Sequence, residues 1–230
     1  TAVDISVAYK WAKLFINQGD ISRLYFTMNY ARESAFMHAL QKVPAGYIEH
    51  GFPRRDIPPL AASQYVYSQG YADYLKSYDP DLATEIIGLD YFPKSDVAPS
   101  KTIVIATLQD WPQYGIGPVG AIFNRALSAA RVHGWHIVFR TRTYDTDAFA
   151  STLDGPWDSV SEATDESFAE CLARVKPAMV WTTWSTAVLD AAAMGVEAVA
   201  FVTQELEEYF VVDIQAFAEV IVPETNSLNK

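Results

Sequence analysis

The stretch that decides the fold is residues 178–202, which read AMVWTTWSTAVLDAAAMGVEAVAFV. Its apolar opening predicts a strand over Ala178–Trp181, and its alanine-rich centre predicts a helix over Thr186–Met194 that Gly195 ends. The apolar run Ala198–Val202 then predicts a second strand. A strand, a helix and a second strand in this order are typical of a crossover between parallel strands. The stretch therefore predicts an α/β fold built on a parallel sheet.

The same alternation of strands and helices extends over the rest of the chain in two series. The first series predicts strands at Arg23–Thr27, Ala45–Glu49, Tyr65–Ser68 and Glu85–Leu89, with helices at Asp4–Asn17, Arg32–Gln41 and Gln69–Ser77. The second series adds strands at Thr102–Leu108, His136–Arg140 and Glu219–Val222, helices at Gly120–His133 and Ser167–Val175, and a polar loop at Asp154–Asp165. A turn-rich stretch, Phe92–Ser100, lies between the two series and predicts a linker. We expect two Rossmann-like halves that face a cleft, an N-terminal domain over residues 1–97 and a C-terminal domain over residues 98–230.

Composition and charge exclude several classes of protein. Half of the 230 residues are apolar and 20% are charged, which is typical of a globular chain and not of a disordered one. The net charge of −11 argues against a nucleic acid or an anionic membrane surface as partner. The single cysteine, Cys171, excludes a disulfide framework and indicates a reducing, cytoplasmic location. No apolar run reaches the roughly 20 residues that a membrane-spanning helix needs.

Hydroxyl side chains cluster between the first strand and the helix of the opening stretch. Thr182, Thr183, Ser185 and Thr186 follow the end of a strand, where open parallel sheets bind their ligands. Ser185 is expected to be the helix N-cap, and the free N–H groups of the first turn favour a phosphate or diphosphate. The alternative is that these hydroxyls only cap the helix and its loop. The sequence contains neither a glycine-rich dinucleotide fingerprint nor a P-loop.

Three other strand ends carry polar residues suited to catalysis or binding. Glu49 and His50 are adjacent at one strand end. A histidine at this place can act as general base, and the alternative is that His50 has only a structural role. Arg140 and Arg142 can hold phosphate oxygens, or else form a surface pair that balances local acid. Gln109, after the first strand of the second series, is a candidate contact to a base or sugar. No His, Cys, Asp or Glu spacing typical of a metal site is present, so no metal is expected.

The order of five motifs along the chain resembles that of a known family. The motifs are Glu49-His50-Gly51, the tyrosine-rich strand Tyr65–Ser68, the segment Ile87–Pro93, Gln109, and the segment Trp184–Gly195. In this order and spacing, the chain from about residue 20 onward is similar to bacterial glycosyltransferases of the two-Rossmann-domain type. These have the GT-B fold, and the resemblance is greatest to those that assemble capsule and other surface polysaccharides.

The resemblance implies an activity and a set of site residues. The activity is transfer of a sugar from a nucleotide-activated donor to a saccharide acceptor, with neither metal nor cofactor, because a helix dipole and an arginine replace the cation. The implied donor-phosphate residues are Ser185, Thr186, Thr183, Arg142 and Arg140. The implied nucleotide or sugar contacts are Gln109 and Thr182, and His50, supported by Glu49, is the implied base on the acceptor side.

Two departures from the family keep other functions open. Arg142-Thr143 stands where many relatives have a His-Pro pair, and an arginine can stabilise charge on a leaving group but cannot donate a proton to it. The first half also lacks the earlier strands of the family's first domain, so we expect a truncated half and further domains in a longer chain. The alternatives are a nucleotide-sugar 2-epimerase and a non-catalytic domain that binds a sugar or a partner.

Overall fold

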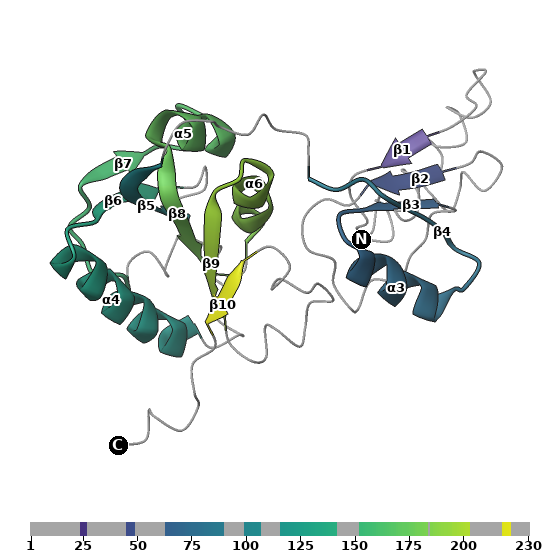
Figure 1. Cartoon of the computed structure of the whole chain (residues 1–230), viewed down its shortest axis with the longest axis horizontal. Coiled ribbons are helices and arrows are strands. Elements are labelled where there is room, and N and C mark those ends of the chain that lie inside the picture. Colours follow the sequence, from purple (N-terminus) through teal and green to yellow (C-terminus); the bar gives the residue numbers. More distant parts are fainter. Residues whose placement is uncertain are drawn as a thin grey trace, which may run out of the picture. The chain divides into compact units, whose positions relative to one another are not determined.

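The computed structural model describes residues 24–26, 45–48, 63–89, 99–106, 116–141, 152–183, 185–202 and 218–221. They belong to two compact units, and the division between the units falls at Gly88 and Leu89. Each unit contains one parallel sheet (Figure 1). The predicted α/β class with two parallel sheets is confirmed. The helices predicted at Asp4–Asn17 and Arg32–Gln41 lie outside the described residues.

The sheet of the first unit has four strands in the order β1-β2-β3-β4. Their bounds are Leu24–Phe26 for β1, Ala45–Ile48 for β2, Ser63–Val66 for β3 and Ala83–Ile86 for β4. Helix α3, Gln69–Tyr78, begins after Ser68, whose Oγ accepts a hydrogen bond from the Tyr71 N–H at 3.3 Å. The buried side of this helix packs against β3, with Leu75 and Val66 in one apolar cluster.

The sheet of the second unit has six strands in the order β10-β9-β8-β5-β6-β7. The strands are β5 Ser100–Ala106, β6 His136–Arg140, β7 Ser159–Ser161, β8 Pro177–Thr182, β9 Glu197–Phe201 and β10 Glu219–Ile221. The helices are α4 Ile116–Val132, α5 Phe168–Val175 and α6 Ala187–Ala193. None of the described helices is long and apolar enough to cross a membrane. The chain runs from β5 outward to β6 and β7 and then returns to the other side of β5 for β8 (Figure 1), so its winding reverses between β5 and β8.

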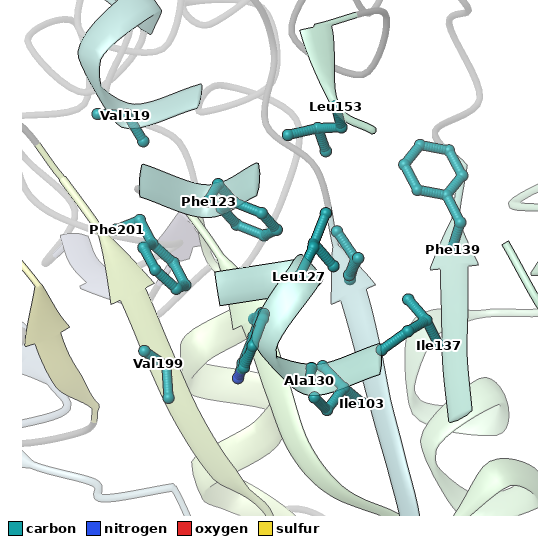
Figure 2. Packing of buried hydrophobic residues seen from close by; sticks show 12 residues of the cluster. Ile103, Val119, Phe123, Leu127, Ala130, Ile137, Phe139, Leu153, Val199 and Phe201 are labelled. Carbon is teal, nitrogen blue, oxygen red and sulfur yellow. The ribbon is translucent and has the colours of Figure 1, made fainter. Parts of the chain in front are cut away.

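The larger of the two buried clusters among the described residues lies between α4 and this sheet (Figure 2). At its centre, the ring of Phe123 lies 4.5 Å from that of Phe201 and 6.0 Å from that of Trp181, measured between ring centroids. Val104 and Val180 are also fully buried, and because strand side chains alternate they face the opposite side of the sheet. Helices α5 and α6 contact β5, β8 and β9. The central strands are thus buried on both faces, as parallel strands usually are.

One strand of the second unit differs from the expectation. The prediction of a loop over Asp154–Asp165 is wrong for Ser159–Ser161, which forms β7 at the edge of the sheet. Its central residue, Val160, pairs with Phe139 of β6. A segment of three residues that includes two serines shows no hydrophobic pattern. The strand therefore forms because its backbone pairs with β6, and not because of its own sequence.

Candidate functional site

The reversal between β5 and β8 marks the place where sheets of this kind bind ligands. In an open parallel sheet, the loops that leave two such strands diverge to opposite faces, and ligands bind beyond the carboxyl ends of the strands. β5 ends at Ala106 and β8 ends at Thr182, and these two residues pair with each other. We call Ala106, Thr182 and Thr183 the switch-point edge. The predicted hydroxyl segment begins one residue earlier relative to the strand than expected, since Thr182 is the last residue of β8 and Thr183 follows it, so both lie at this edge.

Thr182 joins the two strands through its side chain. It is fully buried, and its Oγ1 donates a hydrogen bond to the carbonyl oxygen of Ala106 at 2.6 Å. The hydroxyl proton is therefore used within the protein. Contact of Thr182 with a nucleotide or sugar stays a prediction.

Thr183 differs from its neighbour in the use of its hydroxyl. The side chain is 4% exposed, and its Oγ1 has no hydrogen-bond partner among the residues that the structure describes. A buried polar group without a partner costs roughly 1–3 kcal/mol, and such groups call for an explanation such as a ligand. At the carboxyl end of β8, a bound oxygen atom would remove this cost. Thr183 is therefore the strongest candidate for ligand binding on the switch-point edge.

Helix α6 begins one residue later than the sequence predicts. Ser185 was expected at the N-cap, but the N-cap position is Thr186, whose side chain makes no capping hydrogen bond. Ser185 still contributes, because its Oγ accepts from the Ala187 N–H at 3.3 Å and its carbonyl oxygen accepts from the Val188 N–H at 3.1 Å. Thr186 itself has helical backbone angles, with φ −58° and ψ −16°, so the predicted and observed helix starts differ by only this residue. Thr186 is exposed and Ser185 is half-buried beside it.

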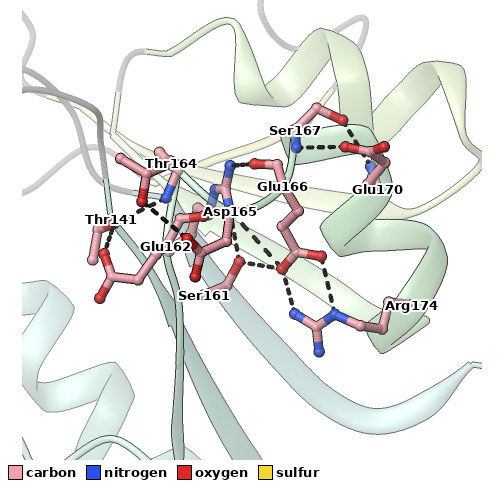
Figure 3. Close-up of polar contacts among 11 residues, drawn as sticks. Thr141, Ser161, Glu162, Thr164, Asp165, Glu166, Ser167, Glu170 and Arg174 are labelled. Carbon is pink, nitrogen blue, oxygen red and sulfur yellow. Dashed lines mark hydrogen bonds and ion pairs between the residues drawn. The ribbon is translucent and has the colours of Figure 1, made fainter.

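Arg140, predicted to hold phosphate, is buried. It donates into a polar network that includes Ser161, Glu162 and Glu166, which Figure 3 shows. Its NH1 group donates to Ser161 Oγ at 2.7 Å and to the Glu162 carbonyl oxygen at 2.9 Å. Its NH2 group donates to the Glu166 carbonyl oxygen. The guanidinium thus holds the turn that connects β7 to α5 against the end of β6. Phosphate binding by Arg140 stays a prediction, and it would have to compete with these acceptors.

The same turn holds Thr141, the residue that follows β6. Thr141 donates its hydroxyl proton to Glu162 Oε2 at 2.6 Å, and its Oγ1 accepts from the Ala163 N–H at 3.2 Å. The Thr141 N–H donates to the carbonyl oxygen of Ser161 at 3.0 Å. Arg140, the last residue of β6, and Thr141, which follows it, therefore both bind this end of the strand to the β7–α5 turn.

Glu166 balances the charge of this network. Its carboxylate accepts hydrogen bonds from Arg174 and, at 2.6 Å, from Ser161 Oγ, and its Oε1 lies 4.0 Å from Arg140 NH1. The hydrogen bonds from Arg174 lower the pKa of Glu166 from 4.5 to about 2 against the opposing effect of burial, and Ser161 and the charges of Arg174 and Arg140 lower it further. Glu166 is therefore an anion over the whole physiological pH range.

The low pKa of Glu166 predicts an acid-sensitive contribution to stability. A carboxyl group whose pKa is lower in the folded than in the unfolded state stabilises the fold fully above its unfolded pKa, and this stabilisation is lost as the pH falls toward the folded pKa. We expect the difference in unfolding free energy between the wild type and Glu166→Gln to be largest above about pH 5 and to shrink by on the order of 2 kcal/mol toward pH 2. Urea unfolding at several pH values measures it. The dependence should weaken in an Arg174→Met background, and a flat profile in the wild-type background would contradict the assignment.

The remaining predicted residues are Glu49, His50, Gln109 and Arg142, and all four lie outside the described residues. Within the described part of the chain, no group of three or more His, Cys, Asp or Glu side chains could hold a metal ion. Sequence reasoning missed two residues that shape this end of the sheet, Glu162 and Glu166. No motif singles them out, because their partners on β6 are more than 20 residues away in the chain.

No protein-family model matches the sequence, and neither does any curated protein. Solved structures do share its fold. MnaA of S. aureus, solved with UDP, has a TM-score of 0.65 at 14% identity, over 96% of this chain and 67% of that chain. A Listeria monocytogenes protein assigned as a UDP-N-acetylglucosamine 2-epimerase has a TM-score of 0.61 at 15% identity, over 85% of this chain and 60% of that chain. TarM has a TM-score of 0.55 at 10% identity, over 96% of this chain and 49% of that chain.

Similarity at these identities concerns the fold. The chain spans between about half and two thirds of the length of these solved chains. Its solved neighbours are GT-B structures, and both parallel sheets of this chain belong to the aligned region, since the alignment with MnaA covers 96% of it. The resemblance noted in the sequence therefore holds at the level of architecture: the protein has the GT-B fold, with its described residues in two parallel-sheet units.

Proposed function

We propose that the protein transfers a sugar from a nucleotide-activated donor to a saccharide acceptor in the synthesis of a surface polysaccharide. The observation that carries the proposal is the hydroxyl of Thr183 on the switch-point edge, which is buried and has no hydrogen-bond partner in the described part of the chain. This edge is where a parallel sheet of this topology binds a nucleotide. The GT-B fold of the neighbours supports a role in sugar transfer.

In this proposal the donor phosphates bind Thr183, with Ser185 and Thr186 as further hydroxyl donors. The acceptor hydroxyl oxygen forms a bond to the anomeric carbon while the bond from that carbon to the phosphate oxygen breaks. The electron pair leaves with the nucleoside diphosphate, and the hydroxyl proton passes to His50, which Glu49 supports.

An arginine is proposed to stabilise the charge on the departing diphosphate. Arg140 already donates to three acceptors of the β7–α5 turn, so the proposal gives this role to Arg142. Gln109 is the proposed contact to the nucleotide. Neither a metal ion nor a cofactor is part of the proposal, and the reaction is placed in the cytoplasm, where a protein with one buried cysteine is stable.

Thr183→Val tests the carrying observation. The variant replaces a buried hydroxyl by a methyl group of similar size, so we expect the free energy of unfolding to stay the same or to rise by up to about 1 kcal/mol. The affinity for UDP should fall about tenfold, because a hydrogen bond to a charged phosphate is lost. Isothermal titration calorimetry with UDP and urea unfolding measure the two effects.

Thr102→Val is the matched control for this experiment. Thr102 is 6% exposed and lies near the amino end of β5, away from the switch-point edge. We expect its UDP affinity to equal that of the wild type. If Thr183→Val and the wild type bind UDP equally well, Thr183 has no role in donor binding, and if the wild type binds no nucleoside diphosphate, the proposed function is wrong.

A second candidate is a nucleotide-sugar 2-epimerase. It is favoured by the likeness in fold, at a TM-score of 0.61, to the Listeria monocytogenes protein assigned to that activity. Incubation with UDP-N-acetylglucosamine and no acceptor separates the two functions, because only an epimerase produces the C2 epimer, which proton NMR detects. Binding of UDP without turnover under any of these conditions would instead indicate a non-catalytic binding domain.

A further inference from the structure

We infer that Thr182 is a positioning residue, whose buried hydroxyl links the ends of β5 and β8 and so orients the hydroxyl of Thr183. The inference rests on the proposed function and deepens it. It gives Thr182 a role through its neighbour, in place of the direct contact with a nucleotide or sugar that the sequence suggested.

The hydrogen bond lies at the last pair of the two strands. Ala106 is the final residue of β5, Thr182 is the final residue of β8, and the two are direct partners in the sheet. The 2.6 Å bond from Thr182 Oγ1 to the Ala106 carbonyl oxygen therefore adds a side-chain link to the last pair of β5 and β8. Thr182 also pairs with Ala200 of β9, so this bond restrains the end of β8 on its β5 side in addition to the backbone pairing on both sides.

Direct contact between Thr182 and a ligand does not fit its surroundings. Thr182 is 0% exposed and Thr183 is 4% exposed, so what distinguishes Thr182 is the use of its hydroxyl. Its proton is already donated to Ala106, so it has no donor left for a phosphate oxygen. Thr183, the next residue, is the opposite case, since its Oγ1 has no partner among the described residues.

The link matters because the position of Thr183 follows from the end of β8. A buried hydroxyl can serve a phosphate only if it is held within hydrogen-bond distance before the ligand arrives, and a displacement of about 1 Å is costly. Thr182 supplies this restraint from the preceding residue. The hydrogen bond from Thr182 to Ala106 thereby keeps the Thr183 hydroxyl in its buried position when no ligand is bound.

A double-mutant cycle on UDP affinity tests the inference. We expect Thr182→Val to weaken UDP binding about fivefold, Thr182→Ser to retain wild-type affinity because it keeps the hydroxyl, and Thr183→Val to weaken binding about tenfold. If Thr182 acts through Thr183, the double variant Thr182→Val/Thr183→Val should bind UDP within about twofold of Thr183→Val alone. Effects that multiply in the double variant would indicate direct contact and overturn the inference, as would unchanged affinity of Thr182→Val.

Hydrogen–deuterium exchange provides a readout that needs no ligand. Thr182→Val should speed exchange of the backbone amides that follow β8, residues 183–187, by at least about threefold, whereas Thr182→Ser and the control Thr102→Val should leave it unchanged. Unchanged exchange in Thr182→Val overturns the inference whether or not UDP binds. Absence of nucleotide binding by the wild type contradicts only the proposed function, so the two failures are distinguishable.

Discussion

Replacing Arg140 by methionine is expected to lower the free energy of unfolding by about 3 kcal/mol. The guanidinium is 6% exposed and donates to three different residues of the β7–α5 turn, namely Ser161, Glu162 and Glu166. Methionine fills a similar volume but leaves these acceptors without their donor. Removal of one partner from a buried ionic network costs roughly 3–5 kcal/mol, and the lower value applies because Glu166 keeps its ion pair with Arg174.

Urea unfolding followed by circular dichroism measures this loss. Arg125→Met is the matched control, because Arg125 is exposed on α4, and substitutions at exposed positions usually change stability by less than about 0.5 kcal/mol. Arg140→Lys should recover only part of the loss, since an ammonium group cannot match the planar fork of donors. If Arg140→Met is as stable as Arg125→Met, the network does not hold the end of β6.

Phe123→Ala is expected to have the largest effect on stability, a loss of about 4 kcal/mol. Phe123 is fully buried between α4 and the sheet, where its ring packs against those of Trp181 and Phe201. Alanine removes the apolar contacts and leaves a cavity that the two remaining rings cannot fill, which costs roughly 3–5 kcal/mol. Since Trp181 directly precedes Thr182 on β8, the variant should also weaken UDP binding.

The control for this variant lies on the same helix. Val132 is 83% exposed near the end of α4, and Val132→Ala should change the free energy of unfolding by less than about 0.5 kcal/mol. Urea unfolding of both variants makes the comparison. A loss below about 1 kcal/mol in Phe123→Ala would mean that α4 does not cover the sheet through this residue.

Much of the fold could be predicted because its information is local. Buried parallel strands are short apolar runs, as in His136–Arg140, whose predicted bounds are those of β6. Helix α5 was predicted one residue early, at Ser167, which is its N-cap and forms a capping box with Glu170. Strand β7 could not be predicted, because its pairing with β6 comes from a segment about 20 residues away.

The candidate site divides in the same way. The hydroxyl segment after β8 could be predicted, since a strand followed by hydroxyl residues and a helix is visible along the chain. The hydrogen bond from Thr182 to Ala106 could not be predicted, because Ala106 is 76 residues away and only the pairing of β5 with β8 brings the two residues together.

The sequence by itself determined the α/β class, the order of strands and helices in the second unit apart from β7, and the place of a hydroxyl-rich strand end. Only the tertiary structure decided how the polar side chains are used. It directed the Arg140 guanidinium at the end of β6 onto the turn between β7 and α5, and it left the Thr183 hydroxyl buried with no partner among the described residues. The physical reason is that hydrophobic periodicity acts over neighbouring residues, whereas a hydrogen bond depends on which distant segments the sheet brings side by side.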